Sequence, residues 1–361
     1  MNHPVTFQQV IARLEENELA YGVLPLQNGA QIVIMPHGGR VFGPFLAGTG
    51  ESALWLTSAF TDAEAFRDFL AGSNSNIGGE RVWIAPEVQY NVRDRARYNE
   101  SYVIPPQVDP GHYTLDQPRP DRWRLAQEMA LQAYNVASGG KTLHLESVIR
   151  AVDDPLRYVR DYPRLLDGVT FAGYERRITL SERTHDAIMS EVWNLIQLHP
   201  GGEILLPASP YAEWTDYYAQ SAAAYQTVHP DHIRVRLTGD YRFKVGYKAA
   251  HLFGRAGYFY PLGEGRACLL VRAFFNNPSS PYVDEAPHKP GSWGDSLHVY
   301  NDGGEYGGFG ELEIQGQAIG GQTGSSSSTD QFILWLYAGP LAKIEVIVQH
   351  LLGIQPAPIP D

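Results

Sequence analysis

Apolar and polar residues alternate with a period of two along most of the chain after Arg122, a pattern typical of strands that bury one face. Most of these runs are bounded by Gly, Pro, Asn or Asp, and they occupy residues 123–136, 142–152, 173–180, 187–198, 203–206, 233–238, 241–245, 267–275, 296–300, 309–318 and 331–337. Strand and helix patterns do not alternate regularly, which argues against a parallel α/β fold. The sequence therefore predicts an all-β fold of antiparallel sandwich layers.

The first part of the chain adds a hairpin and a few short helices. Apolar runs at 19–26 and 30–35 are separated by Gln27-Asn28-Gly29, and Asn-Gly between two such runs is a strong hairpin signal. Helical spacing predicts a helix within residues 1–18, with Thr6 as its N-cap, a second over 62–71 and a third over 340–352. We find no convincing linker, so residues 1–361 are expected to form a single domain.

A late strand pattern places two carboxylates on one face. Because side chains alternate across a strand, Glu311, Glu313 and Gln315 point to one side, and Leu312 and Ile314 point to the other. If the Leu/Ile face packs into the core, the acidic face lies in a cleft or in solvent. The pattern fits an ordinary solvated strand face, and it also fits a general base flanked by hydrogen-bonding partners.

Charge and composition limit the classes of molecule that the protein is expected to bind. The chain has 28 Lys+Arg against 40 Asp+Glu, a net charge of −12, so neither nucleic acid nor an anionic membrane is an expected partner. A neutral small molecule is the simpler expectation, and no pattern indicates an oligomeric state. Without an apolar run of about 18 residues or an apolar N-terminal leader, we expect a cytoplasmic protein. The single cysteine, Cys268, lies in an apolar run and is expected to be a buried, inert thiol.

Three segments, in order along the chain, resemble the galactose-mutarotase-like superfamily, and most of all its divergent bacterial branches. They are Gly78–Glu87 (GGERVWIAPE), Trp193–Leu198 (WNLIQL) followed by Pro200-Gly201-Gly202, and Phe309–Gln315 (FGELEIQ) before a closing strand around Trp335. The resemblance spans roughly residues 20–340. It implies a large antiparallel β-supersandwich with a concave sugar-binding face and a few short peripheral helices.

The resemblance also implies catalytic roles. In catalytic members of that superfamily, a glutamate on a late strand is the general base and a histidine on an earlier strand is the general acid. The Leu-Glu-x-Gln pattern carries the base over to Glu313. The acid position has no counterpart, because Ser190, Glu191 and Val192 precede Trp193 where a histidine is expected. His298 and His199 are the candidates to replace it.

Aromatic and polar residues near these motifs are candidates for sugar binding, because flat rings pack against sugar C–H groups. The candidate residues are Arg81, Trp83, Glu87, Trp193, Trp293, Glu311 and Gln315. For Arg81 two interpretations stay open, a donor to the ligand or a structural arginine paired with Glu80 or Glu87. Trp293 lies in a glycine-rich loop, which favours an exposed platform.

Other chemistries lack their motifs. His229-Pro230-Asp231-His232 has no accompanying HExxH or CxxC, so no metal and no cofactor are expected. Two hypotheses remain. The chain is an aldose epimerase-like isomerase acting on a neutral sugar or sugar derivative, with Glu313 as base. Alternatively, it is a non-catalytic carbohydrate-binding protein that kept the cleft and lost the acid histidine.

Overall fold

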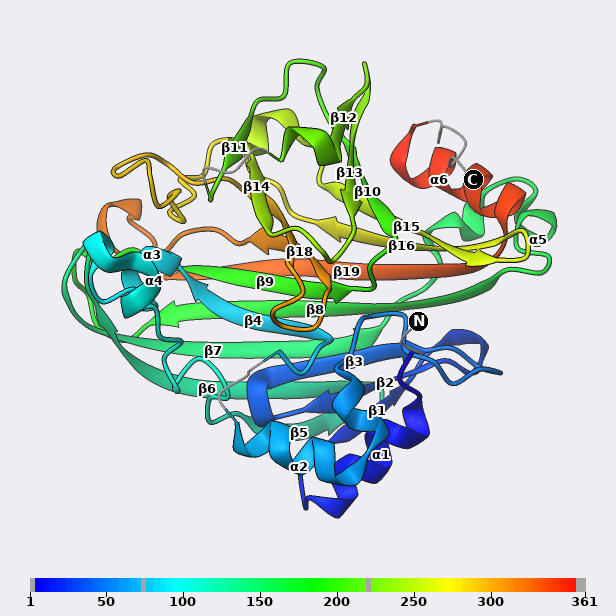
Figure 1. Cartoon of the computed structure of the whole chain (residues 1–361), viewed down its shortest axis with the longest axis horizontal. Coiled ribbons are helices and arrows are strands. Elements are labelled where there is room, and N and C mark those ends of the chain that lie inside the picture. The colour runs from blue at the N-terminus through cyan, green and yellow to red at the C-terminus, as the bar shows by residue number, and fades with distance from the viewer. Residues whose placement is uncertain (1–3, 73–75, 219–221, 355–361) are drawn as a thin grey trace.

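The computed structural model describes residues 4–72, 76–218 and 222–354, and in this part of the chain two antiparallel sheets form the body of the molecule (Figure 1). One sheet has nine strands in the order β1 (Gly22–Pro25), β2 (Gln31–Met35), β3 (Arg40–Phe45), β4 (Glu80–Ala85), β9 (Glu191–Leu198), β18 (Gly310–Gln315), β17 (Leu297–Asn301), β14 (Phe243–Tyr247) and β11 (Trp214–Asp216). The predicted all-β, antiparallel fold class is confirmed.

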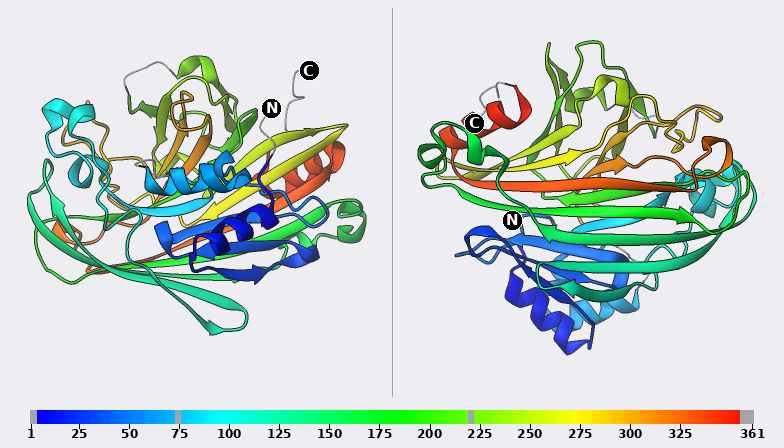
Figure 2. Two further views of the ribbon diagram at one scale, coloured as in Figure 1. Left: turned by 60° about the horizontal axis from the view of Figure 1, so that its bottom comes forward. Right: turned by 180° about the vertical axis from the view of Figure 1, so that it is seen from behind.

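The second sheet has ten described strands and is built from longer ones, which Figure 2 shows from behind. Its order is β12 (Gln226–Val228), β13 (His232–Leu237), β10 (Gly202–Pro207), β15 (Arg255–Gly263), β16 (Arg266–Phe274), β19 (Ser327–Pro340), β8 (Thr170–Glu182), β7 (Gly139–Ala151), β6 (Arg122–Ala133) and β5 (Thr114–Arg119). The predicted runs at 123–136 and 142–152 correspond to β6 and β7, which pair with each other.

The main core lies between the two sheets. Leu312 and Ile314 of β18 belong to this core, together with apolar residues of β7, β8 and β16 from the other sheet. Alternation along β18 then directs Glu311 and Glu313 to the opposite face of the nine-stranded sheet. The sequence prediction for this strand is correct, and it decides where the polar face of the molecule lies.

Helices cover the outer faces and one rim. Helices α1 (Phe7–Glu16) and α2 (Ala63–Ala71) pack on β2 and β3 through a second apolar cluster, and Thr6 caps α1 as predicted. Helix α6 (Leu341–Leu352) packs on β15, β16 and β19 through a third cluster. The short helices α3 (Glu87–Tyr90), α4 (Tyr98–Ser101) and α5 (Tyr162–Leu165) lie at the edges (Figure 1). In the described ranges, no helix combines the length and apolarity needed to span a bilayer.

Strand β15 was missed by the sequence analysis, because Gly257, Pro261 and Gly263 make the segment resemble a loop. The structure gives a reason for one of these glycines. A Cβ atom at Gly257 would lie 2.5 Å from the Leu352 side chain, so glycine makes room for α6 to dock on the sheet. Packing between distant segments thus requires a glycine that hides the strand from a local sequence pattern.

A network of buried charges crosses the core between the sheets. Glu80 of β4 is fully buried, and its Oε1 lies 2.5 Å from Nη2 of Arg272 and 4.0 Å from Nη1 of Arg176. Tyr174 donates a hydrogen bond to Glu80 Oε2, and Asn194 donates one to Oε1. Although burial acts to raise the pKa of Glu80, the two arginines outweigh it and hold that pKa below its usual value.

The network predicts a large loss of stability when its carboxylate is removed. Glu80→Gln leaves two buried guanidinium groups without a carboxylate, so the free energy of unfolding should fall by about 3–5 kcal/mol. Glu146→Gln is the matched control, because Glu146 pairs with Arg124 at the surface and should contribute less than about 1 kcal/mol. Urea denaturation of the three proteins measures both, and equal losses would contradict the role of the network.

Candidate functional site

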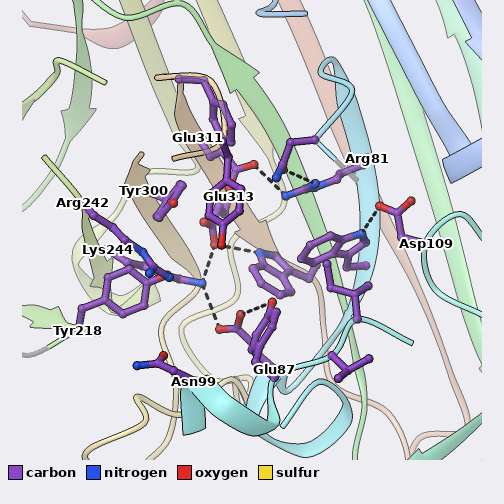
Figure 3. Close-up of a pocket in the computed structure, with 18 of the residues that line it drawn as sticks. Arg81, Glu87, Asn99, Asp109, Tyr218, Arg242, Lys244, Tyr300, Glu311 and Glu313 are labelled. Atoms are coloured by element: carbon purple, nitrogen blue, oxygen red, sulfur yellow. Dashed lines mark hydrogen bonds and ion pairs between the residues drawn. The ribbon is translucent and has the colours of Figure 1, made fainter. Parts of the chain in front are cut away.

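A cavity of about 640 Å³ opens on the polar face of the nine-stranded sheet (Figure 3). Its floor comes from neighbouring strands in the order β4, β9, β18, β17 and β14, and α4 with the segment after it forms one wall. The residues that line it are Asn76, Arg81, Trp83, Glu87, Tyr98, Asn99, Tyr102, Val103, Ile104, Asp109, Trp193, Tyr218, Arg242, Lys244, Tyr300, Tyr306, Phe309, Glu311 and Glu313.

Strand register brings the charged floor residues together. Glu311 pairs across the sheet with Tyr300, and Tyr300 pairs with Lys244, so these three side chains form one row on the cavity face. Glu313 lies two residues further along β18, within diagonal reach of Lys244. Arg81 reaches Glu311 in the same diagonal way from β4.

Glu313 is held as an ionised carboxylate. Its Oε2 lies 2.9 Å from Lys244 Nζ and accepts a hydrogen bond of 2.9 Å from Trp193 Nε1. Burial acts to raise the pKa of Glu313, but Lys244 and the neighbouring His298 outweigh it and lower the pKa to about 2. Lys244 stays an ammonium, because Glu313 and Glu87 raise its pKa against the effect of burial.

The pKa of Glu311 is shifted in the opposite direction. Its Oε1 lies 3.0 Å from Arg81 Nη2 and accepts a hydrogen bond of 2.9 Å from Gln197 Nε2. Burial nevertheless dominates, and with the added repulsion of Glu313 it raises the pKa of Glu311 to about 7, although Arg81 acts to lower it. Two glutamates on one face of one strand therefore differ in protonation at neutral pH.

Each of the two glutamates has one oxygen engaged by the protein and one that is not. The contacts of Glu313 all end on Oε2, and those of Glu311 end on Oε1. Among the residues that the structure describes, none donates a hydrogen bond to Glu313 Oε1 or to Glu311 Oε2. The two remaining oxygens are available to a molecule in the cavity.

The cavity tryptophans have one face covered by a cation. The guanidinium carbon of Arg81 lies 3.9 Å from the ring centre of Trp83, and Lys244 Nζ lies 4.3 Å from that of Trp193. Of the two interpretations of Arg81, the structural one named the wrong partner, because alternation along β4 sends Glu80 into the core while Arg81 pairs with Glu311.

Six of the ten predicted site residues line the cavity, namely Glu313, Glu311, Arg81, Trp83, Glu87 and Trp193. His298 does not, because it is fully buried on β17, with Nδ1 3.6 Å from Glu313 Oε2. Gln315 is buried beside His298 at the far end of β18. His199 is not among the described lining residues either, and its Nε2 lies 3.1 Å from the Ser52 carbonyl oxygen. Trp293 is exposed in its loop, outside the lining.

Lys244 and Arg242 were missed by the sequence analysis. Lys244 lies on β14 and Arg242 directly precedes it. They stand about seventy residues before Glu313 in the sequence, and no motif marks them. A signal was nevertheless present, because Lys244 lies between apolar Phe243 and Val245 in a predicted strand. That is the same alternation that singled out Glu311 and Glu313.

A family model described as "Family of unknown function (DUF6786)" matches residues 5–360. The chain belongs to DUF6786. Comparison with curated proteins gives no match.

Several solved structures match this DUF6786 chain at low sequence identity. A candidate aldose 1-epimerase from Escherichia coli K12 has 10% identity and a TM-score of 0.49, covering 88% of this chain and 99% of its own. A galactose mutarotase-like protein from Lactobacillus casei has the same identity and coverage with a TM-score of 0.44. An aldose epimerase homologue from C. elegans has 10% sequence identity and the same coverage, with a TM-score of 0.43.

The opposite environments of the two glutamates predict opposite pH dependence of stability. Because the folded pKa of Glu313 lies near 2, below the usual 4.5, its contribution is present above pH 4.5 and is lost as the pH falls towards 2. Because the folded pKa of Glu311 lies near 7, the folded state is destabilised as the pH rises from 4.5 through 7.

Urea denaturation of Glu313→Gln and Glu311→Gln between pH 3 and pH 9 measures this difference. Relative to wild type, Glu313→Gln should recover stability as the pH falls below 4.5. Glu311→Gln should gain at least about 1 kcal/mol relative to wild type between pH 5 and pH 8, the equivalent of roughly one pKa unit. Parallel curves for the two variants would contradict the assignment.

Proposed function

We propose that the cavity binds a sugar or sugar derivative, that Glu311 takes and returns the proton of anomeric exchange, as in an aldose epimerase, and that Glu313 orients the sugar. One observation carries the proposal: two glutamates on one strand, each with an oxygen that no described residue engages, line the cavity and have pKa values of about 7 and about 2. Carboxyl groups whose surroundings push their pKa values apart are typical of acid–base sites.

Anomeric exchange needs a proton to leave one oxygen and reach another. The anomeric hydroxyl loses its proton, the bond between the anomeric carbon and the ring oxygen breaks, and the ring oxygen takes up a proton. Both oxygens are bonded to the same carbon, so one carboxyl group reaches them in turn. This geometry suits two carboxylates that approach a ligand from one side.

The charges favour a division of roles that differs from the sequence-based assignment. A group exchanges protons best when its pKa is near the working pH, which describes Glu311 better than Glu313. In this proposal Glu311 takes and returns the proton. Glu313 remains the ionised acceptor that orients a neighbouring hydroxyl through Oε1.

A sugar suits the rest of the lining. Donors and acceptors are mixed around the cavity, with tyrosines, Asn76 and Asn99 beside the ion pairs. Hydroxyl groups of a sugar satisfy both kinds of partner. The motif resemblance to the galactose-mutarotase-like superfamily supports the same class of ligand.

A binding protein without catalysis is the second candidate. No histidine is among the cavity-lining residues in the described part of the chain, and His298 is buried behind Glu313. An epimerase that follows the family pattern needs a histidine acid at the ligand. Its absence from the lining favours a cleft that binds sugar and leaves the anomeric centre unchanged.

Saturation-transfer NMR across a panel of aldoses separates these candidates. An epimerase should accelerate anomer exchange for at least one sugar, and Glu311→Gln and Glu313→Gln should each slow it by roughly 100-fold or more. Glu203→Gln is the control, because Glu203 lies on β10 in an ion pair outside the cavity. Binding without accelerated exchange would establish the second candidate, and no binding of any sugar would refute both.

The pH profile of exchange then tests which glutamate carries the proton. If Glu311 does, the rate should rise with pH and level off above about pH 7, because only its ionised form takes the proton. A rate that stays flat between pH 5 and pH 9 would return the role of base to Glu313.

A further inference from the structure

The described cations that line the cavity are not equally compensated. Arg81 pairs with Glu311, and Lys244 pairs with Glu313 and lies 4.0 Å from Glu87. Arg242 also lines the cavity, but in the described ranges it forms no ion pair with any carboxylate. The ring centre of Tyr218 lies 4.8 Å from the guanidinium carbon of Arg242. Arg242 is exposed and therefore brings to the cavity a positive charge that no described carboxylate pairs with.

A second unused donor lies in the same lining. The Tyr98 hydroxyl is buried and has no hydrogen-bond partner among the residues described. A buried hydroxyl without a partner is costly, so this one is available to a ligand or a water molecule. Tyr98 and Arg242 line the same cavity.

This side is distinct from the pair of glutamates. Figure 3 shows Arg242 and Tyr218 across from Arg81 and Asp109, with Asn99 below them. The acid close to this side, Glu87, accepts a hydrogen bond from Tyr102 and lies near Lys244, and burial raises its pKa. On this side Arg242 has no carboxylate partner among the described residues, although the chain as a whole carries −12.

We propose that the ligand is an acidic sugar, whose carboxylate or phosphate group is bound by Arg242 and Tyr98 while its anomeric end lies at Glu311 and Glu313. This inference rests on the proposed function and replaces the neutral sugar expected from net charge. Arginine presents several N–H donors in a planar fork that matches carboxylate and phosphate oxygens, and a tyrosine hydroxyl adds a further donor. The cavity of about 640 Å³ is within the range of small-molecule sites.

Isothermal titration calorimetry with matched sugars tests the proposal. Glucose, glucuronate and glucose 6-phosphate, with the corresponding galactose series, differ only in the group that Arg242 would bind. Wild type should bind one acidic form roughly 10- to 100-fold more tightly than the neutral sugar, the range expected for a hydrogen bond to a charged group. Whichever of the carboxylate and phosphate sugars binds more tightly identifies the anionic group of the ligand.

Variants assign the preference to named residues. Arg242→Gln should reduce the acidic-to-neutral affinity ratio to near one, and Arg242→Lys should restore part of it. Arg236→Gln is the control, because Arg236 is an exposed arginine on β13 outside the cavity lining and its removal changes the net charge equally. Tyr98→Phe should lower the ratio without lowering the melting temperature, since the hydroxyl has no protein partner to lose.

The outcomes separate this proposal from the proposed function. Neutral sugars that bind as tightly as acidic ones would overturn the acidic ligand and leave the sugar site standing. An acidic preference that survives Arg242→Gln, or that falls equally in Arg236→Gln, would also overturn it. A panel in which no sugar binds would overturn the proposed function and this inference together.

Discussion

The cavity floor depends on one constraint: a buried charge must face an opposite charge. Arg81 and Glu311, and Lys244 and Glu313, are paired at 3.0 and 2.9 Å, and all four side chains are buried. Removing one partner would leave the other charged in a poorly solvated place, which costs several kcal/mol. Because the two pairs connect β4, β18 and β14, they hold together strands that lie far apart in the sequence.

The same pairing sets the chemistry of the site. Glu311 and Glu313 are chemically identical and lie two residues apart, yet one has a pKa near 7 and the other near 2. Burial raises the pKa of both carboxyl groups, and a neighbouring cation lowers it. Lys244 outweighs the effect of burial at Glu313, whereas Arg81 does not outweigh it at Glu311. In the proposed reaction Glu311 takes and returns the proton, while Glu313 stays ionised and orients the sugar.

Charge compensation is also used inside the core, with a different result. Glu80 is one residue before Arg81 on β4, and alternation sends it between the sheets to face Arg272 and Arg176. There the carboxylate is surrounded by donors, so nothing is left for a ligand. In the cavity each glutamate keeps one oxygen that no residue in the described ranges engages. Strand β4 thus places the acidic Glu80 in the core and the cationic Arg81 in the cavity.

The sequence alone determined the antiparallel all-β class, the hairpins, the terminal helices and the two faces of β18, because alternation of period two is a local property. It also identified Glu311, Glu313, Arg81 and Trp193 through nearby motifs. Only the tertiary structure decided that Lys244 neutralises Glu313, that His298 is buried behind it, and that Arg242 stays without a carboxylate partner among the described residues. These facts depend on strand order and register between distant segments, which no local pattern of residues specifies.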